Sequence, residues 1–402
     1  QIIMANVSSS NGLEKRPKLR FPGFDEPWKP IAFGDLVHEY SDRTKEEDED
    51  TLLSAAIEGM FLNTELFGHQ RGASNKGYKK IKYGTMVLST QNLHLGNANV
   101  NQRFEHGMVS PAYKTYDITG CSVDLIAQWI KSDAAKRFFY NATTVGASVC
   151  RRNVEWDTLY EQSLYLPCRD EQEKVAKFLG LLSNRINKQQ QFVSALKKYK
   201  RGLLNKVFSN INGNIYPTVY LSEVADFLQG LTYSPSDVSV AGYLVLRSSN
   251  IQNGVLSFDD CVYVDKKVDE SLQVKCDDVI MCVRNGSKKL VGKTALIPND
   301  MAMTTWGAFM MIIRSKLNDT YIFHYLNSQM FFSQVFKDTG TATINQITKG
   351  ILNECKLPIP PETARKQISK MLSSFDVKIQ NAEICLTTLV ELKKALLQQL
   401  FI

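Results

Sequence analysis

The chain has 402 residues, of which 44% are hydrophobic and 22% charged, a composition typical of a folded protein with two or three domains. No apolar run approaches the roughly 18 residues that span a bilayer, and no basic-then-apolar leader is evident, so we expect a cytoplasmic protein without a membrane segment. The net charge of +7 is unevenly placed, since residues 170–208 carry nine Lys or Arg against three Asp or Glu. The excess therefore indicates a basic segment rather than a uniformly basic surface.

Eight cysteines and five histidines are scattered along the chain without a C-x-x-C or H-x-x-x-H spacing. Zinc sites and disulfide frameworks need such clustered ligands or paired thiols. We therefore expect the cysteines to be reduced core residues, and no metal.

Two regions with both strand-like and helical patterns alternate with two long regions that are helical throughout. Each mixed region has stretches in which apolar and polar residues alternate, as in half-buried strands, and a helical stretch, at 124–143 in the first and 320–339 in the second. We predict an α+β fold with two duplicated mixed α/β domains, separated by two long helices that pack as an antiparallel coiled coil. The predicted segments are domain 1 at 1–163, spacer helix 1 at 164–210, domain 2 at 211–355 and spacer helix 2 at 356–402.

The duplication is visible in the sequence itself. "YKRGLLNKVF" at 199–208 aligns with "LKKALLQQLF" at 392–401, an offset of 193, and the alignment extends back to "LPCRDEQEKVAKFL" and "IPPETARKQISKML". The helical stretches of the two mixed regions also correspond, whereas the loops differ. This pattern predicts two diverged copies of one unit, each of which recognises something different.

Both long helices carry apolar residues at alternating steps of four and three, the spacing of a coiled-coil seam. A helix of about 38 residues is roughly 57 Å long, too long to be covered by one small domain. Lys200 and Lys393 interrupt the two seams at equivalent positions. They are candidate register markers, although lysines that extend to solvent are an equally good interpretation.

The stretch "NGSKKLVGKTALIP" raises the question of a phosphate-binding loop, which needs glycine, four residues, glycine, lysine and serine or threonine. Counting back from Gly292, the first glycine position is occupied by Ser287, because Gly286 comes one residue too early. The surrounding residues predict strand, turn and strand, with Asn285-Gly286 as the turn, instead of a passage from strand into helix. We therefore predict a bend that enters a strand.

The opening "LRFPGFDEPWKPIAFGDL", the stretches "GMVSPAY" and "LRSSNIQNG", and the junction "LPCRDEQ" resemble the specificity subunits of type I restriction-modification enzymes. The resemblance covers nearly the whole chain and includes Glu171 and Gln172 at the start of the first helix. The second junction departs from it, because Ala364 and Arg365 stand at the aligned positions. A partner contact made by the acidic residue would therefore be asymmetric.

The resemblance implies that each mixed domain is a target-recognition domain that reads one half of a split sequence in double-stranded DNA, while the helix pair fixes the unread gap. It implies two modification subunits that bring the methyl donor, and restriction subunits that use ATP for translocation and cleave DNA. This chain would then hold no cofactor and would not be an enzyme. Accordingly, it contains no N-P-P-[YF] or D-P-P-[YF] motif and no intact phosphate loop.

Base reading needs exposed polar side chains that enter a groove, while basic residues at the rim contact phosphate. In domain 1 we select Gln91, Asn92 and His94 for bases and Lys79, Lys80, Arg151 and Arg152 for the backbone. In domain 2 we select Arg247, Asn250, Asn345 and Gln346 for bases and Arg284, Lys288, Lys289 and Lys349 for the backbone. The residues expected on the partner or spacer faces of the helices are Glu171, Gln172, Leu179, Leu182, Ile186, Val193, Leu196, Leu203, Leu372, Phe375, Ile379, Leu386, Leu389 and Leu396.

Two other functions are consistent with the sequence. One is a two-domain scaffold that binds proteins and uses the coiled coil as a spacer, which would show no sequence preference on DNA. The other is an ATP-using enzyme built on residues 286–294, which would bind nucleotide and lose that binding in Lys293→Ala.

Overall fold

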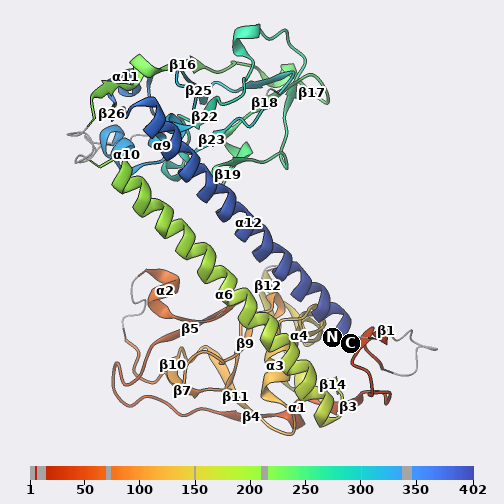
Figure 1. The fold of residues 1–402 in the computed structure, drawn as a ribbon. Coiled ribbons are helices and arrows are strands. Elements are labelled where there is room, and N and C mark those ends of the chain that lie inside the picture. Colours follow the sequence, from red (N-terminus) through yellow and green to blue (C-terminus); the bar gives the residue numbers. More distant parts are fainter. Residues whose placement is uncertain are drawn as a thin grey trace. The chain divides into compact units, whose positions relative to one another are not determined.

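The computed structural model describes residues 5–6, 15–68, 74–148, 151–209, 216–299, 301–336 and 346–402 (Figure 1). The chain divides into two compact units. Unit 1 comprises residues 1–190 and 384–402, and unit 2 comprises residues 191–383. Over the described ranges, no helix is both long and apolar enough to cross a membrane.

Unit 1 is built on a four-stranded antiparallel sheet in the order β4-β11-β8-β9. All four residues of the central strand β8 are buried, as expected of a strand covered on both faces. Two further pairs, β7 with β10 and β5 with β6, extend the unit, and β3 pairs with β14. The elements of this unit before its long helix are β3 (Lys29–Ala32), α1 (Phe33–Leu36), β4 (Val37–Tyr40), β5 (Leu53–Ala56), β6 (Gly59–Leu62), α2 (Asn63–Phe67), β7 (Lys79–Lys82), β8 (Met86–Ser89), η1 (Leu93–Leu95), β9 (Ala98–Val100), β10 (His106–Val109), β11 (Tyr113–Ile118), α3 (Val123–Trp129), α4 (Asp133–Asn141), β12 (Thr143–Ser148), β13 (Arg151–Val154), α5 (Trp156–Glu161) and β14 (Ser163–Leu166).

Unit 2 repeats this framework with a four-stranded antiparallel sheet in the order β16-β25-β22-β23, and β15 pairs with β26 as β3 does with β14. It adds a second four-stranded sheet, β17-β21-β18-β24, in which β18 and β24 are parallel. Its main elements are β15 (Thr218–Tyr220), α8 (Leu221–Val224), β16 (Ala225–Gln229), β17 (Val238–Ser239), β18 (Tyr243–Leu246), η3 (Ser248–Asn250), β19 (Ile251–Gln252), β20 (Val255–Leu256), β21 (Tyr263–Val264), β22 (Val279–Cys282), η5 (Lys288–Leu290), β23 (Thr294–Leu296), β24 (Thr304–Trp306), β25 (Met310–Ser315), α9 (Tyr321–Leu326), α10 (Gln329–Val335), α11 (Lys349–Glu354) and β26 (Lys356–Pro358).

The helical stretch predicted in each mixed region is two short helices instead of one. Ser132 caps α4, because its side chain accepts a hydrogen bond from the backbone N–H of Ala135. Ser328 caps α10 in the same way through Phe331. A serine that satisfies the free N–H groups of a new first turn favours a helix start at that point. The two serines occupy equivalent positions, so the break belongs to the duplicated framework.

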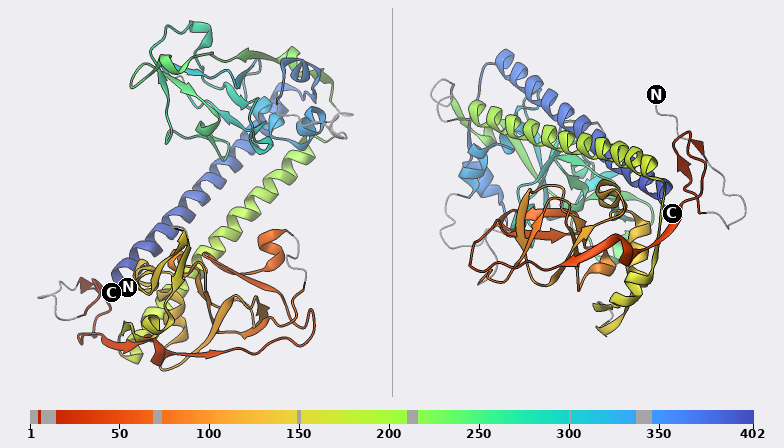
Figure 2. Two further views of the ribbon diagram at one scale, coloured as in Figure 1. Left: turned by 180° about the vertical axis from the view of Figure 1, so that it is seen from behind. Right: turned by 90° about the horizontal axis from the view of Figure 1, so that it is seen from below.

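The long helices are α6 (Arg169–Val207) and α12 (Glu362–Leu400), each of 39 residues, which corresponds to about 58 Å. In unit 1 the first half of α6 packs with the last turns of α12, and in unit 2 the second half of α6 packs with the first half of α12. Figures 1 and 2 show the two helices side by side in both units. The predicted mixed fold with an antiparallel helix pair is confirmed.

A buried ion pair fastens the start of α6 to the N-terminal segment of unit 1. Nε and Nη2 of Arg20 donate to the two carboxylate oxygens of Glu171, each at 2.8 Å. The side chains are 3% and 1% exposed, so both charges are withdrawn from water. Gln172 beside it is also buried: its side chain accepts from the N–H of Ser122 and donates to the carbonyl of Pro167.

Glu171→Ala is expected to lower the free energy of unfolding by about 3–5 kcal/mol, because it leaves the Arg20 guanidinium buried without its counter-charge. Urea denaturation measures the loss. Glu362→Ala is the matched control, since Glu362 lies in the first turn of α12 and pairs with Lys366 at an exposed surface. It should leave the free energy of unfolding nearly unchanged, because water screens an exposed ion pair. Replacing Arg20 by Met together with Glu171 by Leu should recover most of the loss, and failure to recover would show that the pair is not the cause.

Candidate nucleic-acid interface

A continuous surface groove in unit 2 brings together segments that are distant in the sequence. Two adjoining cavities of about 740 Å³ and 330 Å³ share Arg284, Ala308 and Phe309 in their walls. We call this feature the Phe309 groove. Its polar and aromatic lining residues include Gln229, Tyr233, Arg247, Ser248, Arg284, Asn285, Phe309, Gln346 and Lys349.

Backbone hydrogen bonds hold the groove in place. The N–H of Arg284, which follows β22, donates to the carbonyl of Phe309 at 3.2 Å, immediately before β25. On its other side Arg284 forms a β-bridge with Gln346, and the buried Ile347 anchors that segment by donating to the carbonyl of Val283 at 2.7 Å. Phe309, Arg284 and Gln346 therefore lie in a row on three neighbouring backbone segments.

The groove has a basic and partly apolar character. Phe309 is 60% exposed, and the guanidinium carbon of Arg284 lies 5.4 Å from the centroid of its ring. Arg247 pairs with Asp260 at 2.8 Å on the far wall. Cations beside an aromatic face are a common feature of surfaces that bind nucleic acids, because bases stack and phosphates carry negative charge.

The structure brings four of the eight residues selected in domain 2 into this groove, namely Arg247, Arg284, Gln346 and Lys349. Asn250 is buried; its side chain accepts from the N–H of Arg247 and donates to the carbonyls of Ser257 and Asp260, so it orders a turn and offers no amide to a base.

The other domain 2 choices lie elsewhere. Lys289 is exposed in η5, away from the walls of the groove. Lys288 has its backbone in the same turn, but its side chain is outside the described part of the structure, as is the whole of Asn345.

In unit 1 the candidates divide into two places. Gln91 and Asn92 are exposed just before η1, and His94 is within it. Burial, with a smaller effect from the charge of Arg152, lowers the pKa of His94 below its usual value and favours the neutral ring at neutral pH. Arg152 donates to Thr143 and lies over the ring of Tyr140 at 4.2 Å.

The lysines of unit 1 are engaged within the fold. Lys79 is only 6% exposed, and its ammonium donates to the carbonyl of Tyr113 at 2.7 Å, so it is not placed to contact a DNA backbone. Lys80 forms an ion pair with Glu49. Arg151 has its backbone in β13, and its side chain lies outside the described part.

The glycine-lysine-threonine stretch is a bend between strands. β22 and β23 are antiparallel, and Thr294 is the first residue of β23. A phosphate-binding loop would instead lead into a helix at this point. Gly292 has φ = +87°, and a Cβ there would lie 2.8 Å from the ring of Phe332. The glycine is therefore required by backbone conformation and by packing. The Asn285-Gly286 turn is longer than predicted, because η5 is inserted before the bend.

The sequence alone does not distinguish Phe309 from the apolar residues of the strand that follows it. Its position after Gly307-Ala308 and before the apolar run of β25 could have predicted its exposure, because a turn at that point leaves one apolar residue at the surface. Trp306, by contrast, is fully buried, and its ring N–H donates to the carbonyl of Leu228.

The two seam lysines have equivalent partners. In unit 2 Lys200 pairs with Asp376, and in unit 1 Nζ of Lys393 donates to Ser183 at 2.7 Å. Because Ser183 and Asp376 are also related by the offset of 193, each lysine contacts the residue at the same place on the other helix. The contact is an ion pair in one unit and a bond to a neutral hydroxyl in the other, where burial lowers the pKa of Lys393.

The remaining helix positions selected from the sequence follow the seam. Leu179, Val193 and Leu372 are buried, whereas Leu182, Ile186, Leu196, Leu203, Phe375, Ile379, Leu386, Leu389 and Leu396 are half-buried.

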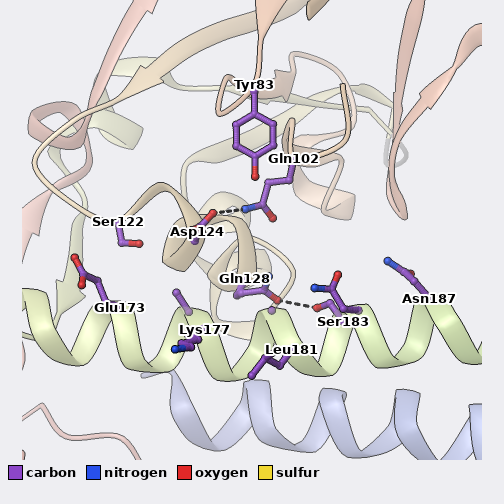
Figure 3. A pocket seen from close by; sticks show the side chains of 13 residues that line it. Tyr83, Gln102, Ser122, Asp124, Gln128, Glu173, Lys177, Leu181, Ser183 and Asn187 are labelled. Atoms are coloured by element: carbon purple, nitrogen blue, oxygen red, sulfur yellow. Dashed lines mark hydrogen bonds between the residues drawn. The ribbon is translucent and has the colours of Figure 1, made fainter. Parts of the chain in front are cut away.

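A polar cleft of about 510 Å³ lies beside α6 in unit 1 (Figure 3). Gln102 donates to Asp124 across it at 2.6 Å, and Ser183 contacts Gln128. Gly180 in its wall corresponds to Ser373 of unit 2, which instead contacts Thr320 and the buried His324. The two copies of the framework therefore differ at this face of the long helices. Among the residues that the structure describes, no group of His, Cys, Asp or Glu could hold a metal ion.

Asp376→Ser is expected to lower the free energy of unfolding by about 1–2 kcal/mol, because Lys200, 14% exposed, loses a charged acceptor. The chain should still fold, because a serine, Ser183, already accepts the hydrogen bond of Lys393 at the equivalent position. Urea denaturation provides the measurement, and Glu383→Ser is the control, because its partner Lys197 is 48% exposed. Equal losses in the two variants would contradict a special contribution from the Lys200 pair.

The comparisons with known proteins agree with this architecture. Residues 216–387 match the family model of the type I restriction modification DNA specificity domain. The StySPI specificity subunit of a type I restriction enzyme from Salmonella potsdam is 26% identical over 190 residues, 44% of this chain and 40% of that protein, so the match spans less than half of the relative. The MjaVIII specificity subunit from Methanocaldococcus jannaschii is 21% identical over 94% of this chain and 92% of its own.

The fold is shared with a solved structure. The S subunit of a type I restriction-modification system from M. genitalium has a TM-score of 0.58 at 14% identity, over 96% of this chain and 99% of that chain. The fold therefore consists of two mixed α/β units, and both long helices contribute to the core of each unit. The family model that matches and these relatives are all of type I restriction-modification specificity subunits, and the solved S subunit shares the fold.

Proposed function

We propose that this chain is the DNA specificity subunit of a type I restriction-modification complex, in which each unit reads one half of a bipartite target and the helix pair fixes the gap between the halves. The single observation that carries the proposal is the duplicated framework with non-equivalent surfaces. The antiparallel sheets correspond in the two units, while the Phe309 groove of unit 2 includes Arg247 and Ser248 after β18, a strand of the second sheet that unit 2 adds.

The helix pair has the properties that a spacer needs. Both helices continue from one unit into the other without a break, and a helix has a fixed rise per residue, whereas a flexible linker has none. Successive major-groove faces of B-DNA recur about every 34 Å, a distance that a helix of 39 residues exceeds.

The proposal places the chemistry on partners. Two modification subunits would bring the methyl donor, and restriction subunits would bring ATP-driven translocation and cleavage. The chain itself would be non-catalytic and without cofactor, acting on double-stranded DNA as the part that selects the site. The four segments predicted from the sequence, two recognition domains and two spacer helices, would be its functional divisions.

The proposal is tested by mapping methylated adenines across the genome of cells with and without this gene, in the presence of the modification subunit. A motif of two short blocks around a fixed gap should disappear with the gene. An isolated chain that binds DNA without sequence preference, together with an unchanged map, would instead favour a protein-binding scaffold.

Exchange of residues 1–160 for the corresponding region of another specificity subunit should change one block of the motif only, because the other block is read by unit 2. The methylation map measures both blocks at once. As a control, insertion of one helical turn into both α6 and α12 should change the gap, or abolish methylation, without changing either block. A change in both blocks after the exchange would contradict the division of labour between the units.

A further inference from the structure

We infer that Arg284 and Phe309 form a base-reading pair, in which Arg284 recognises a guanine and Phe309 contacts the methyl group of a thymine in the adjacent base pair. The inference rests on the proposed function and specifies how unit 2 reads its half of the target. It reassigns Arg284 from the DNA backbone to a base edge, and it adds Phe309, which the sequence did not single out.

The Arg284 side chain has the donors that recognition of guanine requires. The guanidinium of Arg284 lies over the ring of Phe309. Among the residues that the structure describes, it forms no hydrogen bond or ion pair. The nearby Arg247, in contrast, is paired with Asp260. Arg284 therefore offers an unused planar fork of N–H donors, and such a fork matches the O6 and N7 acceptors of guanine in the major groove.

Arg284 and Phe309 are held in place by the fold before any DNA binds. Phe309 and Arg284 are joined through the backbone at 3.2 Å, and the N–H of Val283 donates to the same carbonyl at 3.0 Å. Stacking on the ring limits the directions in which the long arginine side chain can point. A side chain that is oriented before binding loses less conformational entropy when it contacts a base.

Phe309 is placed for an apolar contact with DNA. A single exposed phenylalanine is ordinary on a protein surface, but Phe309 is 60% exposed in the wall of a groove that also carries Arg247, Gln346 and Lys349. The thymine C5-methyl is the apolar group that the major groove offers, and phenylalanine is among the side chains that contact it. The basic residues around the ring match the charge of DNA.

The spacing of the two groups fits neighbouring base pairs. The guanidinium carbon lies 5.4 Å from the ring centroid, between one and two base-pair steps at about 3.4 Å each. When Arg284 lies in the plane of a guanine, a ring beyond its face is farther than one base-pair step from that plane, so it is in reach of the neighbouring base pair and not of the guanine itself. The half of the target read by unit 2 should therefore contain a guanine next to a thymine.

The test uses the full chain with its modification subunits. The methylation map of the native protein and of the domain exchange first identifies the block read by unit 2. Arg284→Ala should then reduce the preference for guanine at one position of that block by roughly 5- to 150-fold, the range for a bidentate contact with a base. Lys349→Ala is the comparison, because loss of a phosphate contact should weaken binding equally on all sequences and lower its salt dependence.

Chemically altered duplexes test the two contacts separately. Replacing the guanine by 7-deazaguanine removes the N7 acceptor, and replacing the thymine by uracil removes only its methyl group. Each change should weaken binding of the native complex when it is made in the block read by unit 2. The change to uracil should not alter DNA binding by the Phe309→Ala complex, which has no ring to contact the methyl group. The same replacements in the other block are the controls.

The outcomes separate this inference from the proposed function. A bipartite motif whose unit 2 block has no guanine beside a thymine, or an Arg284→Ala protein with unchanged base preferences, would overturn the reading pair while leaving the specificity subunit intact. Absence of any bipartite motif would instead overturn the proposed function.

Discussion

The packing of α6 against α12 is the constraint on which both units depend. The core of unit 1 contains Leu179 from α6 and Leu400 from α12, and the core of unit 2 contains Leu204 from α6 and Leu372 from α12. Neither unit therefore has a complete apolar interior without both helices. Since burial of apolar side chains is the main favourable term in folding, the helices are structural walls of the units as well as connections between them.

The two copies of the framework have the same topology but differ in their polar contacts. Glu171 has a buried partner in Arg20, whereas Ala364 occupies the corresponding place in α12. In the seam, a carboxylate faces one lysine and a hydroxyl faces the other. The apolar positions are interchangeable because shape and hydrophobicity suffice there, while buried charges need specific partners and so preserve the differences between the copies.

The large features of the fold could be predicted from the sequence because they are periodic. The seam spacing and the offset of 193 predicted two long helices and two related domains, and the misplaced Gly286 argued correctly against a phosphate loop. The candidate interface was harder to predict, since exposure depends on contacts distant in sequence. Lys79 and Asn250 have polar side chains that suit DNA, yet the fold buries both. Phe309 looks like a strand residue until the turn before β25 is known.

Unit 1 is discontinuous in the chain, and this determines the order in which the protein can fold during its synthesis. The last residues complete its core, where the ring of Phe401 meets that of Trp28 edge to face at 6.3 Å. Residues 191–383 form unit 2 without any later segment. The segments of the second unit are thus all synthesised before the residues that complete the first, and the N-terminal unit, although begun first, closes its core with residues made after those of unit 2.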